Sequence, residues 1–363
     1  MKIHIIGCGI TALSTAIELL RVGHHVEISY VPRENSASQA AGGMLSPSCE
    51  AEGCSKTLIQ AGIESCLLYP HWVADIERQT QFSTEYNTKG TLLVAQHNDH
   101  YRDLEHLHRF HEQYHLQTEW LSRAEVRRKE PNLTRQVGGL FCPQDTQISP
   151  RRLQQALKEY VLLAGTTIHT GKDIQIAWNL SSKQIVDSVY VDGTKMTADI
   201  YVLCDGAWTV DLLHIPIRPV KGQYIIIQGN ELVQHVTRTP NVYIIPRTNN
   251  QTFLGATMEE EGFNNTQTVG ATMDLLYHAF QILPDIYECT IMETGCGFRP
   301  AMRDNHPIIG QTSVENLYCN TGHYRHGIML APYLATLFAQ SLETPSLIPT
   351  EFSTTRYPVS VCG

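Results

Sequence analysis

The first thirty residues contain a pattern that restricts the fold more than any other stretch. KIHIIGCGITALSTAIELLRVGHHVEISY passes from an apolar strand into a helix with apolar residues at helical spacing, and returns to a strand near Val26. The first strand is apolar throughout instead of alternating, which is typical of a central parallel strand covered on both faces. The chain is therefore predicted to begin with a βαβ unit of an α/β fold.

The turn between that strand and that helix carries a dinucleotide-binding pattern. Gly7, Gly9 and Ala12 form G-x-G-x-x-A between a predicted strand and a predicted helix, which is the context that this motif requires. Gly7 permits the tight turn, Gly9 lets the backbone approach a pyrophosphate, and Ala12 lets helix and strand pack closely. Ile10 and Thr11 then form the helix N-terminus that faces the phosphates. The pattern does not choose between a flavin and a nicotinamide dinucleotide.

The second strand ends without the acid that usually binds the ribose hydroxyls of a dinucleotide. Tyr30 stands at that position, and Glu27 comes too early in the strand to replace the acid. Either the Tyr30 hydroxyl or a nearby group such as Glu34 takes this role, or adenosine is bound less tightly.

Composition excludes several classes of protein. Lys and Arg total 27 against 36 Asp and Glu, and a net charge of -9 offers no basic surface to nucleic acid or anionic lipid. The first residues lack the order of a secretory leader, and no apolar run reaches membrane-spanning length. The ten cysteines contain no CxxC pair and are interpreted as reduced thiols. A globular, cytoplasmic protein without a membrane span is expected.

Helical and strand patterns alternate along the rest of the chain. Helices are predicted over residues 55–80, 102–117 and 151–165, a strand over 90–96, and a turn over 138–150. Strand patterns with β-branched and aromatic residues then predominate up to residue 258. This order favours a nucleotide-binding α/β domain (1–80, 140–215 and 295–363) and an antiparallel-sheet substrate-binding domain (81–139 and 216–294).

A glycine pair lies in the stretch SASQAAGGMLSP, residues 36–47, which is followed by CEAE. This stretch resembles the flavin-contacting loop of the glycine oxidase and D-amino-acid oxidase family. The resemblance continues in order through IIGCGITALSTAIEL, QDTQISPRRLQQAL, CDGAW, RPVKGQ, YIIPR, LGATM, GFRPAMRDNHPIIG and GHYRHGIMLAP. It is closest to the glycine oxidases of thiamine biosynthesis, and such an ordered series is far more specific than one motif.

The resemblance implies a D-amino-acid oxidase-like fold, in which a Rossmann-type domain and an antiparallel-sheet domain hold non-covalent FAD between them. The stretch RPAMRDNHPI has no cysteine where related sarcosine oxidases attach their flavin. The glycine pair would let the main chain approach the flat flavin ring, because a Cβ would obstruct it. The family pattern assigns to the cofactor Ala37, Ser38, Gly42, Gly43, Met44, Gly206, the backbone of Ile174 at the adenine, and His323, Tyr324, Arg325, His326, Gly327, Ile328 and Met329 along the pyrimidine edge.

The same resemblance implies the substrate site. Arg299 and Arg325 match the family's substrate-side arginines, Tyr243 stands beside them, and Met258 would line the pocket that limits the side chain. A guanidinium suits a carboxylate because its planar fork binds both oxygens and stays charged when buried. The expected reaction is oxidative deamination of a small amino acid, glycine above others, to glyoxylate and ammonia, with hydrogen peroxide where oxygen is the acceptor. No side-chain base is required if the amine binds neutral.

Two residues depart from the family pattern. Asp205 puts a carboxylate into CDGAW, where small neutral residues are usual. Asn241 stands before the YIIPR strand, at a position where an imidazole would have suited the expected substrate site. A carboxylate near the flavin would disfavour an anionic reduced ring. Asp205 is equally compatible with a place on the surface.

Other functions remain open at this point. A D-amino-acid or sarcosine oxidase or dehydrogenase that uses a quinone or another acceptor is the nearest alternative, and a flavin-binding protein without catalysis is another. HEQYH, residues 111–115, matches the H-E-x-x-H pattern of zinc peptidases, in which His111 and His115 bind zinc and Glu112 is the base. The segment is rich in histidine, so a chance match is expected more readily and no metal site is predicted. Whether the protein forms a homo-oligomer is left open.

Overall fold

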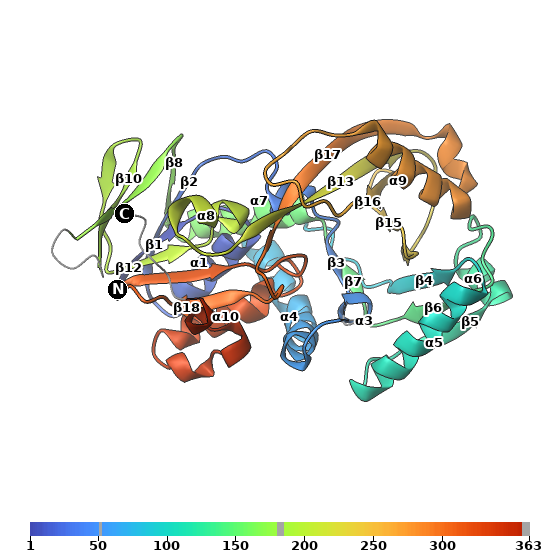
Figure 1. Ribbon diagram of the computed structural model, residues 1–363, viewed down its shortest axis with the longest axis horizontal. Helices are drawn as coiled ribbons and strands as arrows, with labels where there is room; N and C mark the ends of the chain where they lie inside the picture. The colour runs from blue at the N-terminus through green and yellow to red at the C-terminus, as the bar shows by residue number, and fades with distance from the viewer. Residues whose placement is uncertain (51–52, 180–184, 358–363) are drawn as a thin grey trace.

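The computed structural model describes residues 1–50, 53–179 and 185–357, and it is built around two large sheets (Figure 1). The first has six strands in the order β18-β19-β12-β1-β2-β8, all neighbours being parallel except β18 and β19. Its strands are β1 (Lys2–Ile6), β2 (His25–Tyr30), β8 (Thr167–Thr170), β12 (Ile200–Leu203), β18 (Ile308–Gln311) and β19 (Leu317–Thr321). The predicted βαβ unit is confirmed, since α1 (Ile10–Arg21) joins the paired strands β1 and β2.

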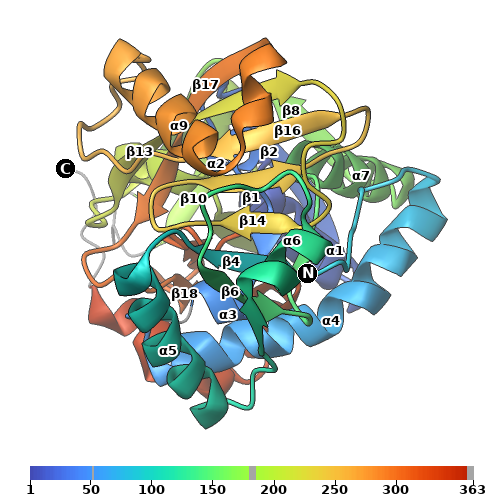
Figure 2. The same ribbon diagram turned by 90° about the vertical axis from the view of Figure 1, so that its right-hand side faces the viewer.

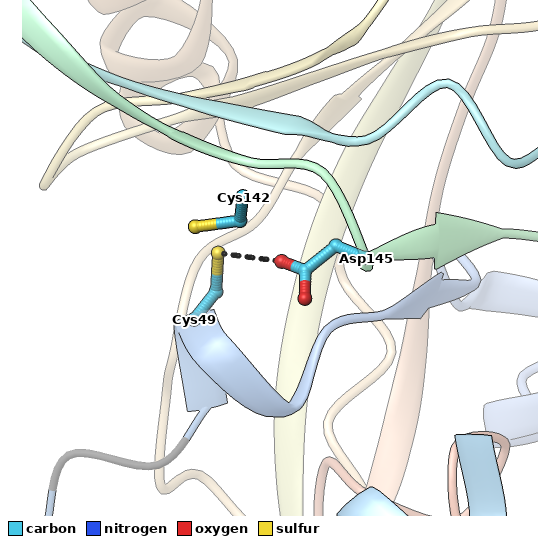
Figure 3. A group of neighbouring side chains, drawn as sticks. All are labelled: Cys49, Cys142 and Asp145. Atoms are coloured by element: carbon cyan, nitrogen blue, oxygen red, sulfur yellow. Dashed lines mark hydrogen bonds between the residues drawn. The ribbon is translucent and has the colours of Figure 1, made fainter. Parts of the chain in front are cut away.

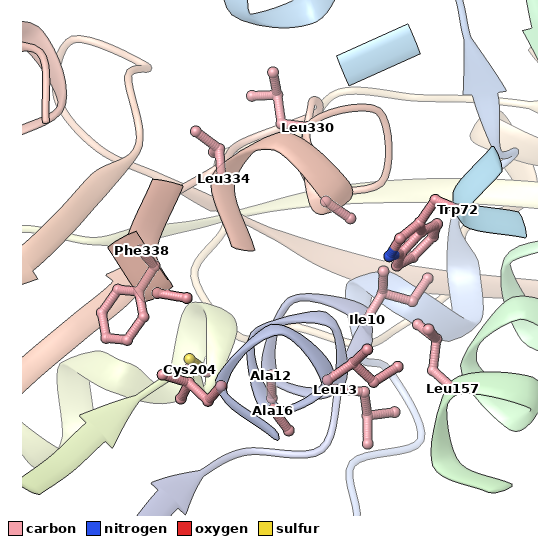
Figure 4. Packing of buried hydrophobic residues seen from close by; sticks show 14 of the residues in the cluster. Ile10, Ala12, Leu13, Ala16, Trp72, Leu157, Cys204, Leu330, Leu334 and Phe338 are labelled. Atoms are coloured by element: carbon pink, nitrogen blue, oxygen red, sulfur yellow. The ribbon is translucent and has the colours of Figure 1, made fainter. Parts of the chain in front are cut away.

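Helices pack over the first sheet and form the main hydrophobic core. They are α1, α4 (Lys56–Thr80), α7 (Pro150–Leu163) and α10 (Ala331–Ser341). Figure 4 shows side chains of α1 facing Trp72 of α4 and Leu157 of α7, with Phe338 of α10 in the same cluster. Burial on all sides explains why the apolar residues of α1 cover more than one helix face. The rigid packing fixes the glycine turn in front of α1.

The second sheet has eight strands in the order β17-β13-β16-β15-β14-β4-β6-β5. Neighbours are antiparallel except β14 and β4. Its half of the molecule, with α5, α6 and α9, faces the viewer in Figure 2. The elements are β4 (Thr91–Ala95), α5 (Asn98–Gln113), β5 (Glu119–Ser122), α6 (Arg123–Lys129), β6 (Gly138–Cys142), β13 (Arg218–Gln228), β14 (Val236–Arg238), β15 (Tyr243–Pro246), β16 (Gln251–Gly255), α9 (Val269–Ile282) and β17 (Thr290–Ala301).

The predicted domain boundaries at residues 140 and 295 fall inside β6 and β17 of this second sheet. β6 also differs from the predicted turn over residues 138–150. A Cβ on Gly139 would lie 2.6 Å from the carbonyl oxygen of Leu93 on the neighbouring strand β4. The glycine pair therefore serves close packing inside a sheet, which is a recognised use of glycine in strands.

Smaller elements connect the two sheets. Residues 37–50, in the loop predicted to contact the flavin, form α2, β3 and α3, and β3 pairs with β7. Within the described residues, no helix is both long and apolar enough to cross a lipid bilayer. The remaining elements are α2 (Ala37–Ala40), β3 (Met44–Leu45), α3 (Pro47–Glu50), β7 (Thr146–Gln147), β9 (Ile174–Trp178), β10 (Val186–Val191), β11 (Thr194–Met196), α8 (Thr209–Leu212) and the 3-10 turns η1 (Gly206–Trp208), η2 (Pro284–Glu288), η3 (Pro345–Leu347), η4 (Thr350–Phe352) and η5 (Thr354–Arg356).

Candidate active site

A cavity of about 1040 Å³ is lined by residues of both halves of the molecule. Its wall includes every predicted site residue except Gly7, Ala12 and Ile174. Gly7 and Ala12 are packed beneath it, as their predicted structural roles require, because Ala12 is fully buried and a Cβ on Gly7 would lie 2.4 Å from the Cys204 carbonyl oxygen. Ile174 lies in β9 against a separate apolar cluster, so its contact with adenine stays a prediction.

One end of the cavity is built by the glycine turn and the start of α1. Gly7 has φ +121°, and Gly9 is the N-cap of the helix. The Ser38 hydroxyl accepts a hydrogen bond from the Ile10 N–H at 3.0 Å. The other N–H groups of a first helical turn have no partner inside the helix, which makes this terminus suited to an anion.

Tyr30 occupies the end of β2 and lines the same end of the cavity. The Lys158 ammonium lies 3.3 Å from the Tyr30 hydroxyl and 5.4 Å from the centre of its ring. Since this ammonium donates to the phenol oxygen, the hydroxyl hydrogen is free for another acceptor. The arrangement supports the first of the two predicted substitutes for the ribose acid, although Glu34 also lines the cavity.

Gly206 gives a test of whether a ligand fits here. It lines the cavity at φ +57°, and a Cβ on it would meet no other protein atom within 4 Å. The missing side chain therefore leaves space open to a ligand and is not required by protein packing. A large cavity, a helix N-terminus and this open glycine together fit a dinucleotide.

The glycine pair Gly42 and Gly43 is also required by packing within the protein, and its predicted approach to the flavin stays a prediction. A Cβ on Gly42 would lie 2.7 Å from Ile245 Cδ1, and one on Gly43, at φ +74°, would lie 2.1 Å from the Ile148 carbonyl oxygen. Arg247 donates to the carbonyl oxygens of Gly42 and Ile148, which ties this loop down. The glycines allow the loop to pack against protein on its far side, a constraint that is separate from access to a flat ring.

Arg299 enters the opposite end of the cavity from β17. Its Nη1 donates to the carbonyl oxygens of Lys221 at 3.2 Å and Thr257 at 3.1 Å. A Cβ on Gly222, which lies on β13 two residues from the register partner of Arg299, would lie 2.4 Å from the guanidinium. Among the described residues, no carboxylate lies within 4.0 Å of this guanidinium.

We call the part of the cavity that is lined by Arg299, Arg325 and Tyr243 the substrate chamber. Tyr243 and Met258 occupy different depths in this chamber. Burial raises the pKa of Tyr243, and the nearby Arg299 and Arg238 oppose that rise. Met258 lines the cavity, but its side chain is 66% exposed, and its sulfur lies 2.8 Å from the Tyr324 hydroxyl. Met258 therefore lies at the rim, whereas Tyr243 lies deep in the site.

Sequence reasoning missed two charged residues of the chamber, Glu50 and Arg238. Glu50 Oε1 lies 2.8 Å from Arg238 Nη1, and its Oε2 lies 2.5 Å from Arg325 Nε. Burial would raise the pKa of Glu50, but the two guanidinium groups hold it below its usual value. The acids of CEAE directly after the glycine pair were a signal for Glu50, whereas Arg238 had none.

Two histidines of the predicted pyrimidine edge are buried and neutral. Burial lowers the pKa of His323 to about 3 and that of His326 to about 4. His323 Nε2 lies 2.9 Å from Asn320 Oδ1, and Asn320 donates to Thr15 of α1. The segment is therefore anchored to the same helix that forms the dinucleotide end.

Asp205 lies in the cavity wall and not on the outer surface. Burial raises its pKa from the ordinary 3.8 to about 7, Arg33 opposes the rise, and Asp211 adds to it. The unfolded chain ionises Asp205 first, so this residue lowers the stability of the folded protein progressively as pH rises from 3.8 to about 7.

Asp205→Asn is accordingly expected to raise the melting temperature of the FAD-free protein at pH 8 and to change it little at pH 4. The amide stays neutral at both pH values, so the cost of ionising a buried carboxyl disappears only where that carboxyl would be charged. Thermal unfolding of both proteins from pH 4 to 8 measures the difference. A constant difference across this range would contradict the account of Asp205.

Beneath α3, a group of three side chains consists of Cys49, Cys142 and Asp145 (Figure 3). The Cys49 thiol donates to Asp145 Oδ2 at 3.5 Å. Burial raises the pKa of Asp145 to about 6, and the adjacent Cys49 together with burial raises that of Cys142. These contacts join α3 to β6 and to the turn after it, and so support the helix that carries Glu50.

The zinc peptidase alternative has no support in the structure. His111 is fully buried and its Nε2 lies 2.7 Å from the Ser48 carbonyl oxygen. Helix α5 ends at Gln113, and His115 follows it with φ +55°. The two imidazoles therefore do not share one helical face as H-E-x-x-H requires. In the described part of the chain, neither belongs to a group of side chains close enough to hold a metal ion.

The comparison with known families agrees with this geometry. The family described as FAD dependent oxidoreductase matches residues 2–341. The chain belongs to this family. FAD as the cofactor, predicted from the resemblance, is thereby confirmed, as is the class of FAD-dependent oxidoreductase.

Relatives in this family include glycine oxidases. A bifunctional protein ThiO/ThiG of Trichormus variabilis is 32% identical over 92% of this chain, and a glycine oxidase of Geobacillus kaustophilus is 28% identical over 93% of this chain and 92% of its own length. The crystal structure of the latter has a TM-score of 0.87 at 26% identity, covering 99% of this chain and 98% of that one. This chain spans about half of the bifunctional relatives, 51% of the Trichormus protein. The predicted D-amino-acid oxidase-like fold is confirmed.

Proposed function

We propose that this FAD-dependent oxidoreductase oxidatively deaminates a small amino acid, with glycine as the favoured substrate. The observation that carries the proposal is the half-buried guanidinium of Arg299 in the cavity wall beside Tyr243, which has no carboxylate partner among the described residues. The names of the relatives, which include glycine oxidases, support the same substrate.

The charges of the chamber explain how a zwitterion would be oriented. Glu50 already pairs with Arg238 and Arg325, whereas no carboxylate among the described residues pairs with Arg299, which contacts two backbone carbonyl oxygens and the Tyr243 side chain. A substrate carboxylate is expected to bind Arg299 more favourably than the two arginines that Glu50 already neutralises. A charge-assisted hydrogen bond in a buried site is strong. Binding there would fix the carboxylate and leave the amine-bearing carbon turned toward the cofactor.

Bound FAD would supply a two-electron acceptor for the hydrogen on that carbon, and water would then hydrolyse the released imine to glyoxylate and ammonia. The residues of this chain contribute binding, orientation and exclusion of water. Neither His323 nor His326 suits a general base at neutral pH, because burial lowers both pKa values to about 4 or below. We therefore assign no base, in keeping with a substrate amine that binds neutral.

The cofactor would be held without a covalent bond. Among the described residues, the cysteines in the cavity wall are Cys8 and Cys204, and both are buried. Burial raises the pKa of the Cys8 thiol to about 11, which disfavours the thiolate that an attachment reaction needs. Denaturation of the purified protein should release all of its FAD into the supernatant.

The products test the proposed reaction. Air-saturated protein incubated with glycine is expected to form glyoxylate, ammonia and hydrogen peroxide in equal amounts. Glyoxylate without peroxide would favour the dehydrogenase alternative, in which a quinone takes the electrons. Oxidation of D-alanine or sarcosine in preference to glycine would move the assignment to those substrates.

A further inference from the structure

The substrate chamber contains more arginine than the binding of one carboxylate requires. Arg238 and Tyr243 face each other across the antiparallel strands β14 and β15. Arg299 lines the same cavity as this phenol and, like Arg238, opposes the rise that burial causes in the pKa of Tyr243. Tyr243 is therefore flanked by two guanidinium groups, one on β14 and one on β17.

Among the described residues, Arg238 has an acid partner and Arg299 has none. Glu50 pairs with Arg238 at 2.8 Å and with Arg325 at 2.5 Å, and its side chain is only 12% exposed. Burial opposes the charge of Arg238, but Glu50 raises the pKa of this guanidinium overall. The carboxylate of Glu50 thus occupies a position between two cations.

Two other acids of the cavity wall, Glu293 and Asp205, lie beside different arginines. Glu293 pairs with Arg151 at 2.5 Å and accepts from Tyr224 at 2.6 Å. Asp205 is placed near Arg33, the cation that acts most on it. Of the carboxylates in the described residues, Glu50 is the one that pairs with Arg238 and Arg325.

A substrate with a second carboxylate would find this place already filled. Its extra charge would have to displace Glu50 from Arg238 and Arg325, or lie beside Glu50 without a cation of its own. Like charges brought together in a buried site cost several kcal/mol. A substrate with a single carboxylate needs only Arg299 and meets no such repulsion.

We propose that Glu50 is a specificity-determining residue, which limits the site to monocarboxylates by occupying the two guanidinium groups that could accept a second carboxylate. This inference rests on the proposed oxidation of glycine and extends it to the class of substrate. It assigns Arg238 as the cation that a second carboxylate would use if Glu50 were neutral.

Two N-substituted glycines of similar size test the proposal. N-ethylglycine and N-(carboxymethyl)glycine share the reacting carbon and amine and differ in the charge of the substituent. The kcat/KM of the wild-type protein for N-ethylglycine is expected to be at least about tenfold higher than its kcat/KM for N-(carboxymethyl)glycine. Equal or better use of the charged compound by the wild-type protein would overturn the proposal without any variant.

Glu50→Gln is expected to raise the ratio of kcat/KM for the charged compound over the neutral one by at least about tenfold. Adding Arg238→Gln to that variant should remove the gain. Glu293→Gln, which neutralises a cavity acid paired with a different arginine, is the matched control and should leave the ratio as it is. FAD content measured by absorbance identifies any protein that is not folded.

An unchanged ratio in Glu50→Gln, or the same gain in Glu293→Gln, would contradict the role of Glu50. Failure of the proposed function gives a different result, because the wild-type protein would then oxidise neither glycine nor N-ethylglycine. If Glu50→Gln does not fold, the wild-type comparison of the two compounds decides the question alone.

Discussion

Replacing Arg299 with alanine is expected to lower kcat/KM for glycine by roughly 10³-fold while FAD stays bound. Removing one partner of a buried charge pair typically costs 2–5 kcal/mol, about 30- to 5,000-fold. In the described part of the chain, Arg299 donates to two backbone carbonyl oxygens and no carboxylate pairs with it, so no acid there loses its partner when this side chain is removed. The loss should therefore fall on the substrate and not on the fold.

Arg299→Lys separates charge from geometry. Lysine keeps the positive charge but cannot bind both carboxylate oxygens in one plane, so an intermediate loss of activity is expected. Steady-state kinetics with glycine and the FAD absorbance of each purified variant provide the two measurements. Wild-type kinetics in Arg299→Ala would remove this residue from the substrate site, and loss of FAD would assign it to the cofactor instead.

Gly43→Ala is expected to abolish FAD binding and to destabilise the protein strongly. An added Cβ would lie 2.1 Å from the Ile148 carbonyl oxygen and 2.8 Å from Pro150, and neither backbone nor a helix N-terminal proline yields easily. The left-handed conformation at φ +74° adds about 1–2 kcal/mol for any residue with a Cβ. The loop from α2 to α3, which lines the cavity, would have to move.

Gly193→Ala is the matched control for that substitution. Gly193 has a similar φ of +80°, but a Cβ there would meet nothing within 4 Å. Only the conformational cost should appear, as a small fall in melting temperature with full FAD content. Equal effects of the two substitutions would show that the packing of Gly43 against Ile148 is not what holds the loop.

Local patterns correctly predicted the βαβ unit and the glycine turn that form one end of the cavity. Strand, turn and helix are contiguous between residues 2 and 21, so the roles of Gly7 and Ala12 could be derived from spacing alone. The substrate end could not be derived in this way, because Glu50, Arg238 and Arg325 come from three distant segments. Only an ordered resemblance to a family placed Arg299 and Arg325 there, and it did not indicate Arg238.

Glycine was the least reliable guide. The glycine pair at 138–139 indicated a turn and lies in β6, where a close neighbouring strand excludes a Cβ. The pair at 42–43 was assigned to the cavity for access to a ring, yet its Cβ positions are blocked by protein atoms. A glycine in the sequence shows where a side chain is absent, but it does not show which neighbouring atoms require that absence.

The central claim is that this chain holds FAD beside a site for glycine. The most direct test is an anaerobic titration of the purified, FAD-loaded protein with glycine, followed through the visible absorption of the flavin. The account predicts complete loss of the oxidised flavin absorption by glycine and its return on admission of oxygen or another acceptor. A flavin spectrum that no small amino acid alters would contradict it.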